Sequence, residues 1–187
     1  MHKLAKTILF GALILIAVRG ECSGSRVSIG TNTIGYLAFA TPNLDLGVSL
    51  HRHWSIHLQG KYNPFWWDVA GAQFQHRQLT ASLGARYWPW YVFSGWNYGA
   101  SFQYSLYNRG GILSPATEEG VAYGLSLSGG YALMINRWMN LEFGLGIWGG
   151  VTRYKEYNSP RCGKLVGQGT KFFILPDDIS VSVVFTF

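Results

Sequence analysis

The chain has 187 residues, which suits a single domain, and only 13% of them are charged, against roughly 25% in ordinary soluble domains. Aromatic residues make up 16%, glycine accounts for 24 residues, and the formal net charge is +6. A soluble protein covers its surface with charge, whereas a surface that meets lipid does not need to. The composition therefore favours a membrane β protein over a soluble aromatic-rich sandwich. The mild basic excess, without any run of Lys and Arg, argues against nucleic acid as a partner.

The N-terminus has the features of a secretory signal peptide. Lys3 and Lys6 precede an unbroken run of apolar and glycine residues over 8–18. That run has the length of a signal h-region and is too short to span a bilayer as a helix. Small residues follow between positions 20 and 25, which indicates cleavage there.

The two cysteines are Cys22 and Cys162. Cys22 leaves open an acylated lipoprotein, although Arg19, Gly20 and Glu21 before it match such processing poorly. In the predicted topology the two cysteines lie at opposite ends of the fold, farther apart than the ~7 Å between Cα atoms that a disulfide tolerates.

The C-terminus carries the clearest strand pattern. From Ile179 to Phe187 every odd position is apolar, and most even positions are small or polar. Such period-2 alternation is typical of a strand with one face in lipid and the other in a polar interior. The strand ends on Phe187, the residue that outer-membrane barrels commonly carry for recognition by their assembly machinery.

The same alternation recurs upstream and predicts eight strands in total. Small Gly, Ser and Ala side chains on one face suit a narrow barrel whose lumen is filled by side chains. The strands are expected near residues 27–39, 44–50, 54–59, 79–87, 96–106, 121–133, 139–151 and 178–187. We therefore predict an all-β fold: an eight-stranded antiparallel transmembrane β-barrel over residues 25–187, following a signal peptide over 1–24, in the cell outer membrane of a Gram-negative bacterium.

The predicted connections alternate between short and long, as in single-chain outer-membrane barrels. Periplasmic turns fall at 51–53, 89–95 and 135–137, and outer loops fall at 40–43, 63–75, 108–119 and 155–176. Aromatic residues are expected to form a girdle at each interface. The inner girdle comprises Trp54, Trp88, Trp90, Tyr91, Trp96 and Trp138, and the outer one Tyr62, Phe65, Trp66, Trp67, Tyr104, Tyr107, Tyr154 and Tyr157. Alternation alone leaves open a soluble lipocalin-like barrel, which would place its apolar face inside.

Several short stretches carry a family resemblance over nearly the whole mature chain. They are residues 41–44, 54–56, 62–66, 86–88, 107–111, 131–133, 138–142 and 162–164. On these stretches the chain resembles an uncharacterised family of predicted outer-membrane β-barrels from Gram-negative bacteria, a domain of unknown function often encoded near fimbrial genes. The resemblance implies a barrel and a possible fimbrial partner, and it implies no activity. Family members often carry a second cysteine near the Cys-Gly element, whereas Cys162 has no such neighbour.

Four charged residues fall on the predicted inner face: Asp45, Lys61, Arg86 and Glu142. A charge in a narrow lumen is costly unless it is paired. We therefore expect a polar network that plugs the barrel, with Glu142 close to Arg86 or Lys61. A proton or ion path is the alternative.

No cofactor, metal or enzyme site is predicted. The histidines lack the three or four convergent ligands that a zinc site needs. The sharpest alternative is a lipid A acyl hydrolase with a Ser–His pair facing the outer leaflet. The stretch His53-Trp54-Ser55 has the right residue types, but the topology places it at the periplasmic end.

The outer loops form the predicted contact surface. Lys and Arg side chains there suit lipopolysaccharide phosphates, and exposed aromatics suit a protein partner. The candidate contacts are Phe65, Trp66, Trp67, Arg109, Arg153, Lys155, Lys164 and Lys171. The sequence thus predicts a small non-enzymatic outer-membrane barrel with a structural or surface-interaction role, associated with outer-membrane lipids and with a surface or fimbrial protein. A narrow small-solute channel is the other alternative.

Overall fold

A computed structural model of the chain describes residues 26–37, 40–69, 72–110, 117–158 and 164–187. The predicted signal peptide over 1–24 and both cysteines, Cys22 and Cys162, lie outside the described residues. The fold is all-β apart from one five-residue helix. Within the described ranges, no helix is both long enough and apolar enough to cross a membrane.

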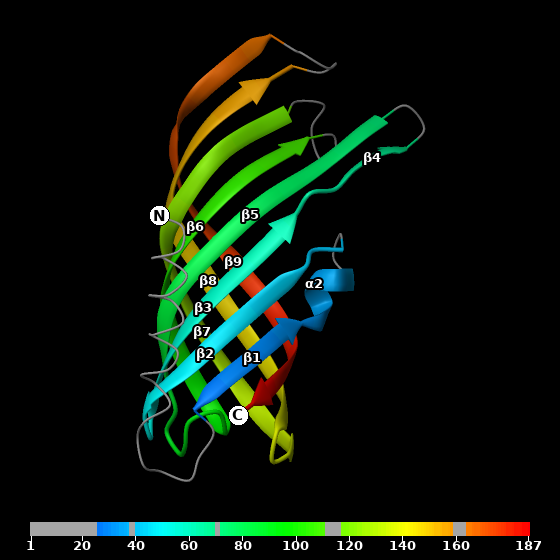
Figure 1. Cartoon of the computed structure of the whole chain (residues 1–187). Helices are drawn as coiled ribbons and strands as arrows, with labels where there is room; N and C mark the ends of the chain where they lie inside the picture. The colour runs from blue at the N-terminus through cyan, green and yellow to red at the C-terminus, as the bar shows by residue number, and fades with distance from the viewer. Residues whose placement is uncertain (1–25, 38–39, 70–71, 111–116, 159–163) are drawn as a thin grey trace, which may run out of the picture.

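Eight antiparallel strands form a closed ring (Figure 1). The ring closes because β1 pairs with both β2 and β9, while β3 pairs with β5. A ninth short strand, β4, pairs only with β5, at the end of the ring opposite Arg26 and Phe187; this end is called the outer end below, and the end with Arg26 and Phe187 the inner end. The elements are β1 (Val27–Asn32), α2 (Thr33–Leu37), β2 (Asn43–His51), β3 (Trp54–Asn63), β4 (Trp66–Val69), β5 (Ala72–Tyr87), β6 (Gly95–Gly110), β7 (Thr117–Asn136), β8 (Met139–Tyr157) and β9 (Leu165–Thr186). The predicted number of strands in the ring is confirmed.

The strands pair with a stagger that accumulates around the ring. Gly30 of β1 pairs with Val184 of β9 on one side. In the other direction, each residue pairs with the next one around the ring, and the succession reaches β9 at Phe173 instead of Val184. Starting from Gly30, it runs Asp45, Gln59, Ser82, Gln103, Gly124, Gly150 and Phe173. Such a stagger tilts the strands and lets a sheet close on itself. It also brings residues that are distant in sequence to the same level of the interior.

The two faces of the ring differ in chemistry. Inward positions are mostly polar and buried, such as Ser55, Thr80, Gln103, Ser126 and Asn140. Outward positions are apolar and exposed; examples are Leu58, Leu83, Phe102, Leu125 and Leu145, with 43–67% of each residue accessible. A soluble barrel would show the opposite arrangement. The structure therefore excludes the alternative with the apolar face inside.

The first predicted strand, residues 27–39, was too long. β1 ends at Asn32 and α2 follows directly. The side chain of Asn32 accepts a hydrogen bond from the backbone N–H of Ile34 at 3.1 Å, and its own N–H donates to the side chain of Asn43 at 2.6 Å. Asparagine is a favoured residue at helix N-termini because its side-chain oxygen accepts from the first turn. The chain turns there instead of continuing the strand.

Two predicted outer loops are largely strand. Most of 63–75 belongs to β4 and β5, and most of 155–176 belongs to β8 and β9. Pro176 lies inside β9, next to a register shift in the pairing with β8. Proline is tolerated in a sheet at such bulges because the ladder is interrupted there. β5–β9 extend well beyond β1 and β2, as Figure 1 shows.

The β5–β6 connection folds into the inner end of the ring. Trp88, predicted as a girdle residue, is instead fully buried and packs with Val92, Phe93 and Ala132. The rings of Trp88 and Phe93 meet edge to face at 5.8 Å between centroids. The backbone N–H groups of Trp88 and Val92 donate to the carbonyls of His53 and Arg52, respectively. This cluster, called the inner plug below, lies at one end of the polar interior.

Candidate functional site

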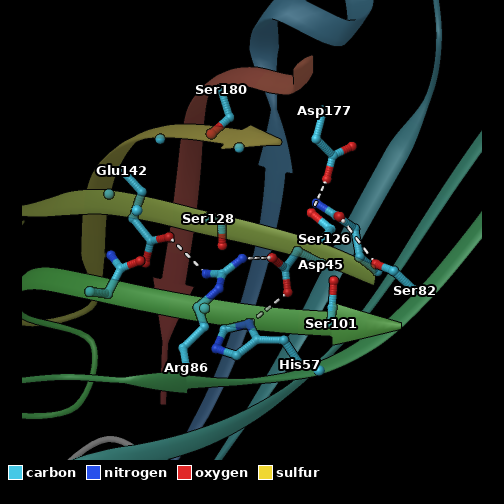
Figure 2. Close-up of a pocket in the computed structure, with 18 of the residues that line it drawn as sticks. Asp45, His57, Ser82, Arg86, Ser101, Ser126, Ser128, Glu142, Asp177 and Ser180 are labelled. Carbon is cyan, nitrogen blue, oxygen red and sulfur yellow. Dashed lines mark hydrogen bonds and ion pairs between the residues drawn. The ribbon is translucent and has the colours of Figure 1, made fainter. Parts of the chain in front are cut away.

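An arginine inside the ring joins two carboxylates from distant strands. Arg86 of β5 donates from Nη2 to Asp45 Oδ2 of β2 at 2.6 Å and from Nη1 to Glu142 Oε2 of β8 at 3.2 Å. Figure 2 shows Arg86 between the two carboxylates. The expected contact between Glu142 and Arg86 is therefore present. Because guanidinium is planar and carries several donors, one Arg side chain pairs both acids at once.

A second chain of hydrogen bonds starts from Asp45. Its Oδ1 lies 2.8 Å from His57 Nδ1, and His57 Nε2 lies 2.9 Å from Ser55 Oγ. Ser55 and His57 are two residues apart on β3, so their side chains point to the same face. Asp45 lies on β2, the strand that pairs with β3. The connectivity serine–histidine–aspartate is that of a nucleophilic triad. Sequence reasoning had considered His53 with Ser55 and missed this set.

The inner plug occupies the space in front of the serine. Trp88 Nε1 donates to Ser55 Oγ at 2.8 Å, and Ser55 is completely buried. Phe93 lies edge-on to the His57 ring at 6.3 Å between centroids. A nucleophilic serine needs room for an acyl carbon and nearby donors for the developing oxyanion. In this arrangement the indole of Trp88 occupies the space beside Ser55 Oγ, and the hydrogen-bonded set links β2, β3 and the β5–β6 connection.

A second ion pair lies further toward the outer end. Lys61 Nζ is 3.7 Å from Asp177 Oδ1, and Asp177 also accepts hydrogen bonds from Gln103 and Ser126. Lys61 therefore pairs with Asp177, whereas Glu142 pairs with Arg86. Asp177 was missed because the sequence placed it at the edge of a predicted loop, whereas β9 carries it inward.

Between the two charge clusters lies a cavity of about 90 Å³ lined by serines, glycines and the charged residues (Figure 2). This volume suits a few small polar molecules and is too small for a sugar or an acyl chain. Within the described part of the chain, no group of three or more His, Cys, Asp or Glu is arranged to hold a metal ion. The interior chemistry is thus that of a packed polar network.

A further polar cluster lies on the inner face near the outer end. Glu118 accepts hydrogen bonds from Tyr107 at 2.7 Å and from Lys171 at 3.1 Å, and Arg109 lies over the Tyr107 ring. Lys171 also lies over the Tyr154 ring at 4.4 Å. Partial burial alone would raise the pKa of Glu118, but the hydrogen bonds from Tyr107 and Lys171 and the nearby positive charges lower it below its ordinary value.

The predicted contact residues are therefore divided between two faces. Two of the basic candidates, Arg109 and Lys171, face inward. Arg109 lies over the ring of Tyr107, and Lys171 lies over the ring of Tyr154 and donates to Glu118, so these two girdle candidates also face inward. Four other candidates are exposed: Phe65, Arg153, Lys155 and Lys164. Trp66 and Trp67 lie in β4, but their side chains are outside the part that the structure describes.

The fold and its interior define a class: an antiparallel ring of eight strands with apolar residues outside and a paired-charge network within. The chain belongs to the family described as protein of unknown function (DUF3575), whose model matches residues 9–187. Neither a curated protein nor a solved structure matches the chain. The family supplies no activity, so any function is argued from the geometry.

Proposed function

We propose that the protein is an outer-membrane β-barrel of a Gram-negative bacterium with a closed lumen, acting through its outer surface rather than by catalysis. The observation that carries the proposal is the inversion of its faces: large apolar residues are exposed around the ring while polar and charged residues are buried within it. In water such a surface would aggregate. In a bilayer it is the expected arrangement, because lipid solvates the apolar side chains.

Exposed aromatic residues lie at both ends of this apolar surface. Trp54, Tyr87, Trp96 and Trp138 are exposed near the inner end, where Trp54 and Tyr87 contact each other at 5.1 Å between centroids. Tyr62 and Tyr104 are exposed nearer the outer end. Aromatic side chains concentrate at headgroup depth because one part of the ring is apolar and another is polar. These two sets of aromatic residues support a transmembrane orientation with Arg26 and Phe187 at the inner end.

The closed interior directs the functional proposal to the outer surface. The inner plug and the Asp45–Arg86–Glu142 bridge occupy the lumen near the inner end, which supports a barrel that does not conduct solutes. The exposed outer strand ends carry basic and aromatic residues, which suit lipopolysaccharide and a surface or fimbrial protein partner.

Heat modifiability tests the proposal. Membrane fractions would be separated by density, and the protein would be run on a gel with and without boiling. We expect it in the outer-membrane fraction, with a faster-migrating unboiled band and β-type circular dichroism. Recovery in the periplasmic extract, with no shift on boiling, would refute the proposal. If the protein is in the outer-membrane fraction, cross-linking from a cysteine introduced at Lys164 would identify a surface partner.

A lipid hydrolase is a second candidate because of the hydrogen-bonded set Ser55–His57–Asp45. A fluorophosphonate probe distinguishes the two functions. Labelling of the folded protein that is lost in Ser55→Ala would support the hydrolase. We expect no labelling, since Trp88 covers Ser55. A channel is tested separately by conductance in planar bilayers, where we expect no steady current through the plugged lumen.

A further inference from the structure

We propose that an outward-facing groove near the outer end of the strands binds the phosphate-bearing headgroup of an outer-leaflet glycolipid. The inference rests on the proposed membrane location and adds a site and a ligand class to it. Only some of the basic contact residues predicted from the sequence line this groove. Two residues of the groove, Arg77 and Asn108, were not among the predicted contacts.

The groove crosses six strands, from β3 through β5–β9, and has a volume of about 990 Å³. Its lining includes two adjacent rows of residues on the outward face. The lower row lies nearer the middle of the strands. It contains three apolar residues that are direct cross-strand neighbours: Leu79, Leu106 and Val121. The upper row is polar and follows the same pairing: Arg77, Asn108, Glu119, Lys155 and Gln168. The groove therefore lies where the apolar surface gives way to a polar one.

The basic side chains of the groove are free to bind an anion. Arg77, Arg153 and Lys155 are exposed, and no described carboxylate forms an ion pair with them. The one acid in the groove, Glu119, accepts a hydrogen bond from Tyr157 at 2.9 Å. The lining thus has three basic residues against one acidic residue. By contrast, Lys171 on the inner face is already paired with Glu118.

Asn108 supplies an independent indication of a ligand. Its Oδ1 is buried, and no described group donates to it. A buried acceptor without a donor lowers stability, because the loss of its bonds to water is not compensated. Asn108 lies directly between Arg77 and Glu119 in the upper row. A sugar hydroxyl or amide N–H placed there would satisfy Oδ1 while Arg77 held a phosphate.

The three chemistries of the groove together select one ligand class. Arg77, Arg153 and Lys155 suit phosphate, Asn108 suits a hydrogen-bond donor such as a hydroxyl, and the apolar row suits the start of an acyl chain. A phosphorylated, acylated sugar presents all three at the outer interface of a bilayer. A simple anionic phospholipid carries a single phosphate and fits the site less well, because Arg77 on β5 is separated by two strands from Arg153 and Lys155 on β8, whereas a diphosphorylated sugar presents a phosphate to each side.

The test measures lipid binding to the full-length protein purified from membranes in detergent. Diphosphorylated lipid A would be titrated and the complexes counted by native mass spectrometry. We expect the double variant Arg77→Gln/Lys155→Gln to bind roughly tenfold more weakly, as expected for the loss of two charge-assisted contacts at a partly screened site. Lipid A stripped of its phosphates should bind both proteins equally. Phosphatidylglycerol should bind the unmodified protein more weakly than diphosphorylated lipid A does.

A matched control removes the same charge elsewhere. Arg52→Gln/Arg137→Gln changes two exposed basic residues that lie outside the groove and that are not candidate lipid contacts, and it should bind as the unmodified protein does. Asn108→Leu should weaken binding while leaving resistance to heat equal or higher, because an unsatisfied acceptor is removed. Equal weakening by the control, or unchanged binding in the groove variant, would overturn the inference. So would equal binding of phosphatidylglycerol, which would indicate nonspecific charge attraction.

The heat shift and circular dichroism of each preparation separate the two failures. A protein that forms a heat-modifiable barrel but binds lipid A regardless of the groove variants would overturn this inference alone. A protein that lacks the heat shift and is soluble in the periplasm would overturn the membrane proposal and this inference with it.

Discussion

The indole N–H of Trp88 donates to Ser55 Oγ inside the strand ring, at a distance of 2.8 Å. Trp88 comes from the β5–β6 connection and Ser55 from β3, so this bond ties the inner plug to the wall. Ser55 Oγ also contacts His57 Nε2, which in turn contacts Asp45. The plug, the wall and the charge network are therefore one connected unit.

Replacing Trp88 tests how much of the stability depends on the plug. Trp88→Ala removes the largest fully buried side chain and should lower the free energy of unfolding by about 3–5 kcal/mol. Trp88→Phe retains an aromatic ring and loses the hydrogen bond, so its cost should be clearly smaller. Urea titration in lipid vesicles measures both. Equal costs for the two variants would mean that the hydrogen bond, rather than the packing, holds the plug.

The charge network predicts unequal effects for its members. Arg86→Met leaves Glu142 without its ion pair and Asp45 with only His57, and it should destabilise the fold by about 3–5 kcal/mol. Glu142→Gln leaves the pair of Arg86 with Asp45 intact and should cost less. Denaturant titration of both variants at pH 7 checks the order, and a larger loss for Glu142→Gln would contradict it.

The glycines Gly124 and Gly150 lie opposite each other on β7 and β8. A Cβ on Gly150 would lie 2.1 Å from the carbonyl oxygen of Tyr123, far closer than van der Waals contact. Gly150→Ala should therefore force the strands apart and reduce the yield of refolded protein severalfold. Gly60 on β3 is the control, because a Cβ there would meet nothing within 4 Å. Gly60→Ala should refold like the unmodified protein, as judged by the unboiled gel band.

The cluster around Glu118 predicts a dependence on pH. The folded pKa of Glu118 is lowered, so its pairing with Lys171 stabilises the fold above the unfolded pKa. This contribution is lost as the pH falls through the folded pKa. The difference in unfolding midpoint between the unmodified protein and Glu118→Gln should therefore shrink from pH 7 toward acid. A difference that is constant with pH would show that the carboxylate charge plays no part.

Local sequence patterns were informative about the faces of the strands but not about their ends. Alternation has a period of two in any strand, so it placed Asp45, Arg86 and Glu142 on one face before any contact was known. Strand ends depend on cross-strand pairing. β8 extends as far as Tyr157, and β9 begins already at Leu165, because the backbones of the two strands hydrogen-bond to each other. This pairing is not a property of either segment alone.

The sequence by itself determined an all-β chain, eight strands in the ring and which polar residues share one face, because each follows from the alternation of neighbouring residues. Only the tertiary structure decided that Trp88 enters the lumen, that Ser55, His57 and Asp45 form one hydrogen-bonded chain, and that Lys61 pairs with Asp177. The physical reason is the stagger of the ring. It decides which inward residues share a level, and it is set by the register of all eight strands together rather than by any single segment.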